Sequence, residues 1–215
     1  MKISKIFLLF IFTLSIVFLN CKENPKQSNI EFKDEQSNIE NINSKAIEAL
    51  EFCKSNNFNT DFCILIDMSI HSGKNRMFIY DFKKNEIERS ALCAHGSGKD
   101  NNKSTTEKPL FGNEEGSLLT SLGKFKIGAR AYSQFGINIH YKLHGLEETN
   151  NNAFQRIVVL HSYTPISPTE IYPFHLPLGY SHGCPVTDDD TMKFLDKKLK
   201  NINKPVLLWI YYDNI

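Results

Sequence analysis

The sequence lacks an excess of charge of either sign. Its 215 residues include 25 Lys and Arg against 24 Asp and Glu, which gives a formal net charge of +1. Domains that bind nucleic acid usually gather basic residues on one face, so this balance gives no support for a nucleic-acid partner. The length fits one folded domain preceded by an export segment. With 16 Phe and 8 Tyr, the chain has enough apolar surface to bury a sizeable core.

A hydrophobic run long enough to span a bilayer is also missing. Ile6–Leu19 is almost wholly apolar, but a membrane-spanning helix needs about 20 such residues. Lysines precede this run and polar residues follow Cys21, so we predict a lipoprotein-type signal peptide over residues 1–20 with lipid on Cys21. Asn20 is an unusual residue before a lipidated cysteine, so ordinary signal cleavage and an uncleaved anchor remain alternatives.

A zinc-hydrolase signature is absent as well. The sequence contains no His-Glu-x-x-His motif and no close Cys/His pairing, so little supports a zinc site. We therefore predict no metal and no cofactor, and keep a zinc hydrolase only as an alternative. Its ligands would come from four histidines: His95, His144, His161 and His182.

The predicted lipid anchor would place the protein in the cell envelope, exported and facing the periplasm. Residues 21–44 are polar and almost free of large apolar side chains, which predicts a flexible tether between the membrane and the domain. After Ser44, a plausible helix cap, apolar residues recur at helical spacing. The folded domain is therefore predicted over residues 45–215.

Export leaves two interpretations open for the remaining cysteines outside the candidate site. Disulfides are permitted outside the cytoplasm, so Cys53 could pair with Cys63. Unpaired cysteine is, however, among the most buried residue types, and Cys63 and Cys93 both lie in apolar segments. We favour three buried, unpaired thiols.

Short apolar runs between turn-forming residues predict a mainly β domain. The predicted strands are Phe62–Met68, Arg76–Phe82, Glu86–Ala94, Gly123–Ala129, Ile137–Leu143, Arg156–His161 and Val206–Tyr212. A late helix is predicted with Thr187 as its cap, an acidic first turn and a basic end, which suits the helix dipole. Its buried face would carry Met192, Leu195 and Leu199.

A cysteine stands at the most informative short motif, the segment Tyr180–Thr187. Gly183 comes directly before Cys184, so the backbone can turn sharply there and present its N–H groups to a ligand. The predicted helix begins just after this cysteine, and a helix N-terminus favours an anion. The position therefore predicts a lowered pKa for the Cys184 thiol.

A thiolate nucleophile needs a base and an oxyanion hole. His161 ends an apolar run and is followed by a turn-rich loop, so its side chain is expected to face a cavity. A lone histidine is more often a core or surface residue. The shared pattern with Cys184 favours the catalytic interpretation.

A strand ending in His-Ser, then a loop, then Ser-His-Gly-Cys resembles the catalytic pattern of the L,D-transpeptidases, the YkuD-like enzymes. Other segments, in the same order, resemble the murein L,D-transpeptidase catalytic domain branch: Ile66–Ser69, Arg76–Asp81, Ala94–Gly98, Phe111–Asn113, Ser121–Phe125 and His144–Glu147. The resemblance spans about residues 60 to 213, and several ordered motifs are more specific than one tetrapeptide. It implies a mainly β sandwich or barrel with a few short helices and long active-site loops.

The resemblance also implies the catalytic roles. Cys184 would attack the carbonyl carbon and His161 would take the thiol proton. The carbonyl of Ser162 would orient the imidazole, in place of the carboxylate of a usual triad. Backbone N–H groups of His182, Gly183 and Cys184 would form the oxyanion hole.

Further side chains are implied to line a substrate groove. The candidates for substrate binding are His95, His144, Tyr180 and Ser181, of which Ser181 would also brace the nucleophile loop. His182 is a candidate for substrate contact, with a purely structural role as the alternative. Pro185 stands where most members of the family carry an aliphatic residue followed by Arg, which puts that arginine's substrate contacts in doubt. The segment Ile166–Gly179 is rich in Pro and aromatics and is predicted to form a flap over the groove.

The function implied by this resemblance is acyl transfer on the stem peptides of peptidoglycan. A thioester on Cys184, resolved by an amine from a neighbouring stem, would give a 3–3 crosslink or attach another amine. Resolution by water would make the same site an L,D-carboxypeptidase. An inactive wall-binding lipoprotein on the same fold is a further alternative, although Cys184 and His161 are both present.

Overall fold

A computed structural model describes residues 25–99 and 104–213 of the chain. The chain divides into two compact units, Met1–Asn38 and Ile39–Ile215, and the architecture given below is that of the second unit. The predicted signal peptide and Cys21 lie outside the described residues. Within the described part, no helix is both long and apolar enough to cross a membrane.

Helix α1 (Pro25–Ser55) includes most of the stretch that was expected to be a flexible tether. The expected domain boundary at residue 45 also falls too late, because Ile42 is only 1% exposed and belongs to a core cluster with Ala46 and Ala49. Residues four apart lie on one face of a helix, so the apolar stripe starts one turn earlier, at Ile42.

Eight strands form one sheet in the order β3-β2-β1-β8-β4-β5-β6-β7. Their bounds are β1 Phe62–Asp67, β2 Met77–Asp81, β3 Glu86–Ala91, β4 Gly123–Tyr132, β5 Ile139–Gly145, β6 Val159–Ser162, β7 Val186–Thr187 and β8 Leu207–Tyr211. The pairs β1–β8 and β6–β7 are parallel and the other neighbours are antiparallel. Beyond β3, the N–H of Ala94 donates to the carbonyl of Val186 at 2.8 Å, so the two ends of the sheet meet and it nearly closes into a barrel. The mainly β, barrel-like prediction is confirmed.

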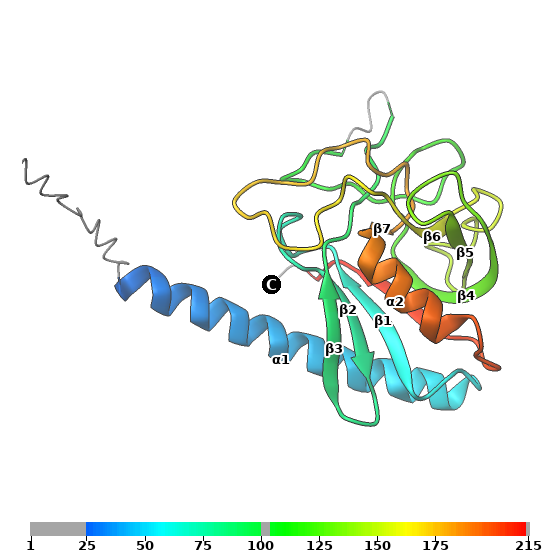
Figure 1. Ribbon diagram of the computed structural model, residues 1–215, viewed down its shortest axis with the longest axis horizontal. Coiled ribbons are helices and arrows are strands. Elements are labelled where there is room, and N and C mark those ends of the chain that lie inside the picture. The colour runs from blue at the N-terminus through cyan, green and yellow to red at the C-terminus, as the bar shows by residue number, and fades with distance from the viewer. Residues whose placement is uncertain (1–24, 100–103, 214–215) are drawn as a thin grey trace, which may run out of the picture. The chain divides into compact units, whose positions relative to one another are not determined.

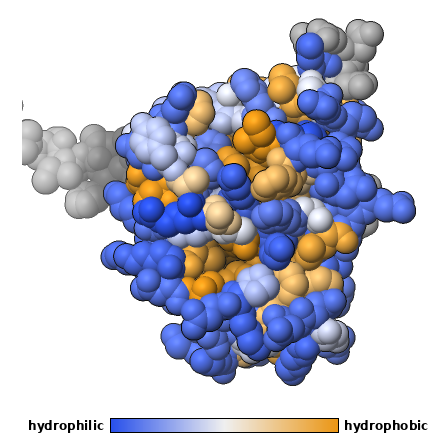
Figure 2. Space-filling model, turned by 90° about the vertical axis from the view of Figure 1, so that its right-hand side faces the viewer, coloured by the Kyte–Doolittle hydropathy of each residue, from blue (hydrophilic) through white to orange (hydrophobic). Residues whose placement is uncertain are grey.

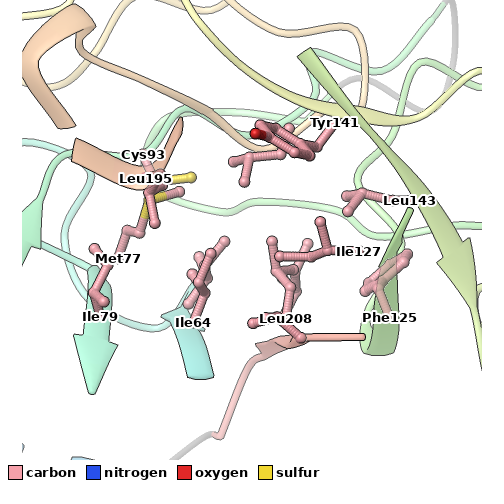
Figure 3. Close-up of a cluster of buried hydrophobic side chains, with 14 of the residues drawn as sticks. Ile64, Met77, Ile79, Cys93, Phe125, Ile127, Tyr141, Leu143, Leu195 and Leu208 are labelled. Carbon is pink, nitrogen blue, oxygen red and sulfur yellow. The ribbon is translucent and has the colours of Figure 1, made fainter. Parts of the chain in front are cut away.

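The inner face of the sheet packs around helix α2 (Asp189–Leu199). In Figure 1, α2 lies between the wall formed by β1–β3 and the wall formed by β4–β6. Phe125, Ile127 and Leu143 alternate with outward residues along β4 and β5, and they meet α2 through Leu195. Figure 3 shows these side chains converging with Ile64 and Met77 from the other wall and with Leu208 from β8, the strand between β1 and β4.

The cap of α2 differs from the prediction by one residue. The Asp188 carboxylate, rather than Thr187, accepts the N–H of Thr191 at 2.9 Å and caps the helix. Thr187 instead ends β7, and its hydroxyl donates to the Leu92 carbonyl at 2.9 Å. Sequence patterns did not predict β7, because two residues are too few to show strand periodicity.

Two structures cover parts of the outer face of the sheet. The part of α1 that belongs to the second unit packs over β1, β2 and β8 through one core cluster, which includes Cys53 and Cys63. The loop after β6 packs over β7 and the end of β3 through Ile166 and Leu176. The outward side chains of β4, β5 and β6 lie between these two covers.

The three remaining cysteines are buried and unpaired, as we favoured. Burial raises the pKa of Cys53 to about 12 and that of Cys93 to about 11. They are therefore inert thiols in apolar surroundings.

Candidate active site

The nucleophile turn lies directly before β7 and is built around Gly183. Its φ is +110°, in the region that favours glycine, and a Cβ there would lie 2.7 Å from the Leu119 carbonyl oxygen. The buried Ser181 hydroxyl accepts the N–H of Gly183 at 3.0 Å and donates to the carbonyl of Cys184 at 2.6 Å. Ser181 therefore stabilises the turn through these two hydrogen bonds and does not line a groove.

The oxyanion hole has one donor fewer than predicted. The Gly183 N–H is already bonded to Ser181, so that part of the prediction is wrong. Among the described residues, the N–H groups of His182 and Cys184 have no hydrogen-bond acceptor. These two groups remain the candidate donors for an oxyanion.

The Cys184 sulfur lies against β6. Its Sγ receives the N–H of Val159 at 3.4 Å, and its thiol faces the Ile157 carbonyl at 3.9 Å. The parallel register pairs His161 with Val186, which places Val159 opposite Cys184. Because side chains alternate along a strand and Leu160 points into the core, Val159 and His161 face outward. Cys184, two residues before β7, therefore lies beside β6 at Val159, two residues before His161, and its half-buried side chain also packs against the core.

The imidazole of His161 is held in one orientation. It is 8% exposed, and its Nδ1 lies 3.0 Å from the carbonyl oxygen of Ser162, the contact expected from the sequence. Since a carbonyl only accepts, Nδ1 carries the proton and Nε2 is left as the basic nitrogen. The Ser162 hydroxyl in turn accepts the N–H of Ile137 at 3.1 Å, which fixes the supporting strand end.

Burial lowers the pKa of His161, with a smaller contribution from the nearby His140, while the hydrogen bond to Ser162 opposes the shift. A lowered pKa keeps the imidazole neutral at pH 7, so Nε2 is free to accept a proton.

The thiol itself does not have the lowered pKa that its place before a helix suggested. Burial raises the pKa of Cys184, and the Val159 N–H and the Arg156 charge oppose this only in part. Helix α2 starts at Asp189, five residues beyond the sulfur, and the carboxylate of Asp188 already caps it. The helix N-terminus is therefore neutralised by its own residues, and the resting thiol is protonated until a base takes the proton.

His95 does not line a groove. It is 4% exposed, its Nδ1 accepts from the buried guanidinium of Arg76 at 2.9 Å, and its Nε2 faces the Thr105 carbonyl at 3.3 Å. Burial and the Arg76 charge lower the pKa of His95 to about 4. The substrate-binding prediction for His95 is wrong because local sequence did not show that Arg76 packs against it.

The other predicted substrate residues lie closer to the surface. His144 stands on the outer face of β5 and stacks on Phe154, with ring centroids 4.7 Å apart. Tyr180 is half-buried and packs in the same apolar cluster as Cys184. His182 is exposed beside the nucleophile.

The sheet register brings further residues to the site that sequence analysis missed. Antiparallel pairing sets His140 opposite His161 and Lys142 opposite Val159. Alternation along the predicted strand could have placed His140 and Lys142 on one face, but only the register shows that β5 neighbours the histidine strand. Arg156, in the turn before β6, lies close to the nucleophile turn, since its Nη2 would be 3.2 Å from a Cβ on Gly183.

The predicted flap is anchored to another loop. The N–H groups of Ile171 and Tyr172 donate to the Gly73 carbonyl at 2.8 and 3.0 Å, and Ser72 bonds to His175 at 2.9 Å. The segment Ile166–Gly179 is therefore held against the turn around Gly73 by hydrogen bonds. It also packs against β7, beside the site.

Large apolar side chains are exposed near this face. Phe135 lies 5.6 Å from the His161 ring and is 51% exposed, and Ile157, whose carbonyl faces the sulfur, is 74% exposed. Figure 2 looks onto the side where Figure 1 places β4–β6 and shows apolar patches set among polar side chains.

Within residues 36–99 and 104–213, no three His, Cys, Asp or Glu side chains gather as metal ligands, so the zinc alternative has no ligand set there.

Comparison with known proteins gives one family. The sequence model of the family described as "L,D-transpeptidase catalytic domain" matches residues 33–211. No curated protein matched the sequence.

Three solved structures are similar to the chain at low identity. Bd1075 of Bdellovibrio bacteriovorus has 14% identity and a TM-score of 0.43, over 72% of this chain and 49% of that one. The helical cell shape determining protein Pgp2 of Campylobacter jejuni has 13% identity and a TM-score of 0.43, over 72% and 48%. An L,D-transpeptidase of Xylanimonas cellulosilytica has 13% identity and a TM-score of 0.37, over 70% and 60%. The chain thus spans about half the length of the first two.

Proposed function

Because this chain belongs to the L,D-transpeptidase catalytic domain family, we propose that it is a cysteine acyltransferase acting on the stem peptides of peptidoglycan. The observation that carries the proposal is the parallel pairing of β6 with β7, which sets Cys184 beside Val159, two residues before His161. The Cys184 sulfur accepts the Val159 N–H, and the Ser162 carbonyl orients His161 and leaves Nε2 as its basic nitrogen.

The first half-reaction forms a thioester. As the Cys184 sulfur attacks the carbonyl carbon between the third stem residue and D-alanine, its proton passes to Nε2 of His161. The N–H groups of His182 and Cys184 receive the developing oxyanion, and each such donor is worth roughly 3 kcal/mol. When the C–N bond breaks, His161 gives its proton to the departing D-alanine amine, and the acyl group stays on sulfur.

The second half-reaction releases the enzyme. An amine from a neighbouring stem attacks the thioester while His161 takes a proton from it. The C–S bond breaks, and the sulfur regains a proton from His161. The product is a 3–3 crosslink, or another amine attached to the stem. Water in place of the amine gives L,D-carboxypeptidase activity at the same site.

The outer face also fits a substrate that carries carboxylates. Lys142 lies across from Val159, and its Nζ is 5.5 Å from the centre of the Phe154 ring. Lys126 pairs with His144 on the next strand. Within the part of the chain that the structure describes, neither lysine is ion-paired with a carboxylate. We assign this cationic face to the free carboxylates of the stem peptide.

A Lys142→Met variant is accordingly expected to raise KM for a stem tetrapeptide about tenfold with kcat little changed, because it removes one charged contact made before and during reaction. Steady-state kinetics of D-alanine release measures both constants. Lys193→Met is the matched control, since the exposed Lys193 pairs with Asp190 on the solvent side of α2. An unchanged KM in the Lys142 variant would remove this lysine from substrate binding.

The decisive test of function is incubation of the full-length protein with a disaccharide-tetrapeptide. Mass spectrometry would follow release of D-alanine and formation of the crosslinked dimer, with Cys184→Ala as the blank. D-alanine without dimer selects the carboxypeptidase, and both products together select the transpeptidase. Neither product from the folded wild-type protein would support the inactive wall-binding alternative, and full sensitivity to EDTA would revive the zinc alternative.

We also propose export through a signal peptide over residues 1–20 and a lipid on Cys21, which would hold the domain at the membrane surface facing the periplasm. Intact-mass measurement of the membrane-fraction protein, with Cys21→Ala beside it, tests this. A soluble mature chain that carries no lipid would favour ordinary signal cleavage instead.

A further inference from the structure

Arg156 lies in the turn that leads into β6, and its guanidinium is held by the segment before β4. Nη1 donates to the Gly112 carbonyl at 3.0 Å and to the Ser121 hydroxyl at 2.5 Å. Nη2 donates to the Leu119 carbonyl at 2.6 Å, with the Ser117 hydroxyl at 3.4 Å. Arginine's planar fork suits such a set of acceptors and restricts the group to one place.

That place is beside the nucleophile turn. Nη2 would lie 3.2 Å from a Cβ on Gly183, and the Leu119 carbonyl oxygen to which it donates would lie 2.7 Å from the same position. The guanidinium and this carbonyl together occupy the space next to the residue that precedes Cys184. Movement of Arg156 would therefore release the turn.

Arg156 is also linked to the sulfur through the residues that follow it in the chain. The next residue, Ile157, offers its carbonyl to the Cys184 thiol, and Val159 donates its N–H to the same sulfur. The charges that act on Arg156 are those of Cys184 and of Glu114. The Arg156 cation is thus the charged group that opposes the effect of burial on the Cys184 pKa.

We propose that Arg156 is a positioning residue that clamps the loop of residues 112–121 to the nucleophile turn and favours the charged form of the Cys184 sulfur. When the thiol proton passes to Nε2 of His161, the sulfur becomes an anion and the imidazole a cation. The Arg156 charge lowers the free energy of that state relative to the neutral pair. Its effect on turnover rests on the proposed function, whereas its effect on the thiol does not.

The test measures the reactivity of the thiol directly. Alkylation of Cys184 by iodoacetamide, which forms a C–S bond and expels iodide, would be followed in the full-length chain from pH 6 to 11 by peptide-level mass spectrometry. Because the thiolate is the reacting species, Arg156→Met is expected to slow alkylation at pH 7 about tenfold and to raise its pH midpoint by about one unit. Arg156→Lys, which keeps the charge, should fall between the two.

Three further variants separate charge from structure. Ser117→Ala combined with Ser121→Ala loosens the clamp with the cation kept, so the melting temperature should fall while the alkylation midpoint stays. Arg156→Gln keeps N–H donors without the charge. If the Met variant does not fold, the alkylation midpoint of the Gln variant tests the effect of the charge instead. Arg130→Met is the matched control, since Arg130 is exposed and paired with Asp196.

Alkylation profiles of folded Arg156→Met or Arg156→Gln that superimpose on the wild-type profile would overturn the proposal. Iodoacetamide needs no peptidoglycan, so the outcome is independent of turnover. A shifted midpoint in a protein that releases no D-alanine would end the proposed function and leave the role of Arg156 standing.

Discussion

Cys184→Ala and His161→Gln are each expected to reduce D-alanine release by about 10⁴-fold or more, and the double variant is expected to be no worse than either. The sulfur forms the bond to the acyl group, and the raised pKa of Cys184 leaves the resting thiol protonated. Without His161 to take that proton, the nucleophile is not formed. Since neither residue works without the other, the two losses are not additive.

Single-turnover assays on a disaccharide-tetrapeptide measure these losses. Lys193→Gln is a suitable control, because Lys193 is exposed and paired with Asp190. Losses that multiply in the double variant would show two independent contributions and contradict the dyad. A Cys184→Ala protein with wild-type turnover would end the cysteine mechanism altogether.

The sequence predicts the two halves of this dyad because each has a local signal. Gly-Cys before a helix and an apolar run ending in His can both be recognised within a few residues. What brings them together is the parallel pairing of β6 with β7, and β7 consists only of Val186 and Thr187. A strand this short has no periodicity, and pairing between distant segments is not encoded in either one alone.

The wrong predictions share the same physical origin. The expected low thiol pKa assumed an unoccupied helix start, whereas Asp188 caps α2 and burial dominates at the sulfur. His95 looked like a groove residue because Arg76, which buries it, is distant in sequence. Arg156 was placed at the start of the predicted strand Arg156–His161, but its role was not predicted, since its partners lie 35 to 44 residues earlier in the chain. Strand existence, by contrast, follows from local apolar runs and was predicted well.

The second large effect is expected from Gly183→Ala. The added methyl would lie 2.7 Å from the Leu119 carbonyl oxygen and 3.2 Å from Arg156 Nη2, so the turn, or the loop that packs on it, has to move. Alanine at a φ of +110° adds backbone strain of about 1–3 kcal/mol. A displacement of about 1 Å at a nucleophile costs about a hundredfold in rate, so turnover should fall by at least that factor. Kinetics and chemical denaturation measure the two effects separately.

Gly179→Ala separates strain from contact. Gly179 also has a positive φ, +94°, but nothing lies within 4 Å of a Cβ built there. This control should lose stability through the backbone alone and keep its turnover, since it does not press on the nucleophile turn. If Gly183→Ala loses stability yet retains full turnover, the position of Cys184 does not depend on the close packing of Gly183 against Leu119 and Arg156. Equal loss of turnover in both variants would instead trace the effect to backbone strain.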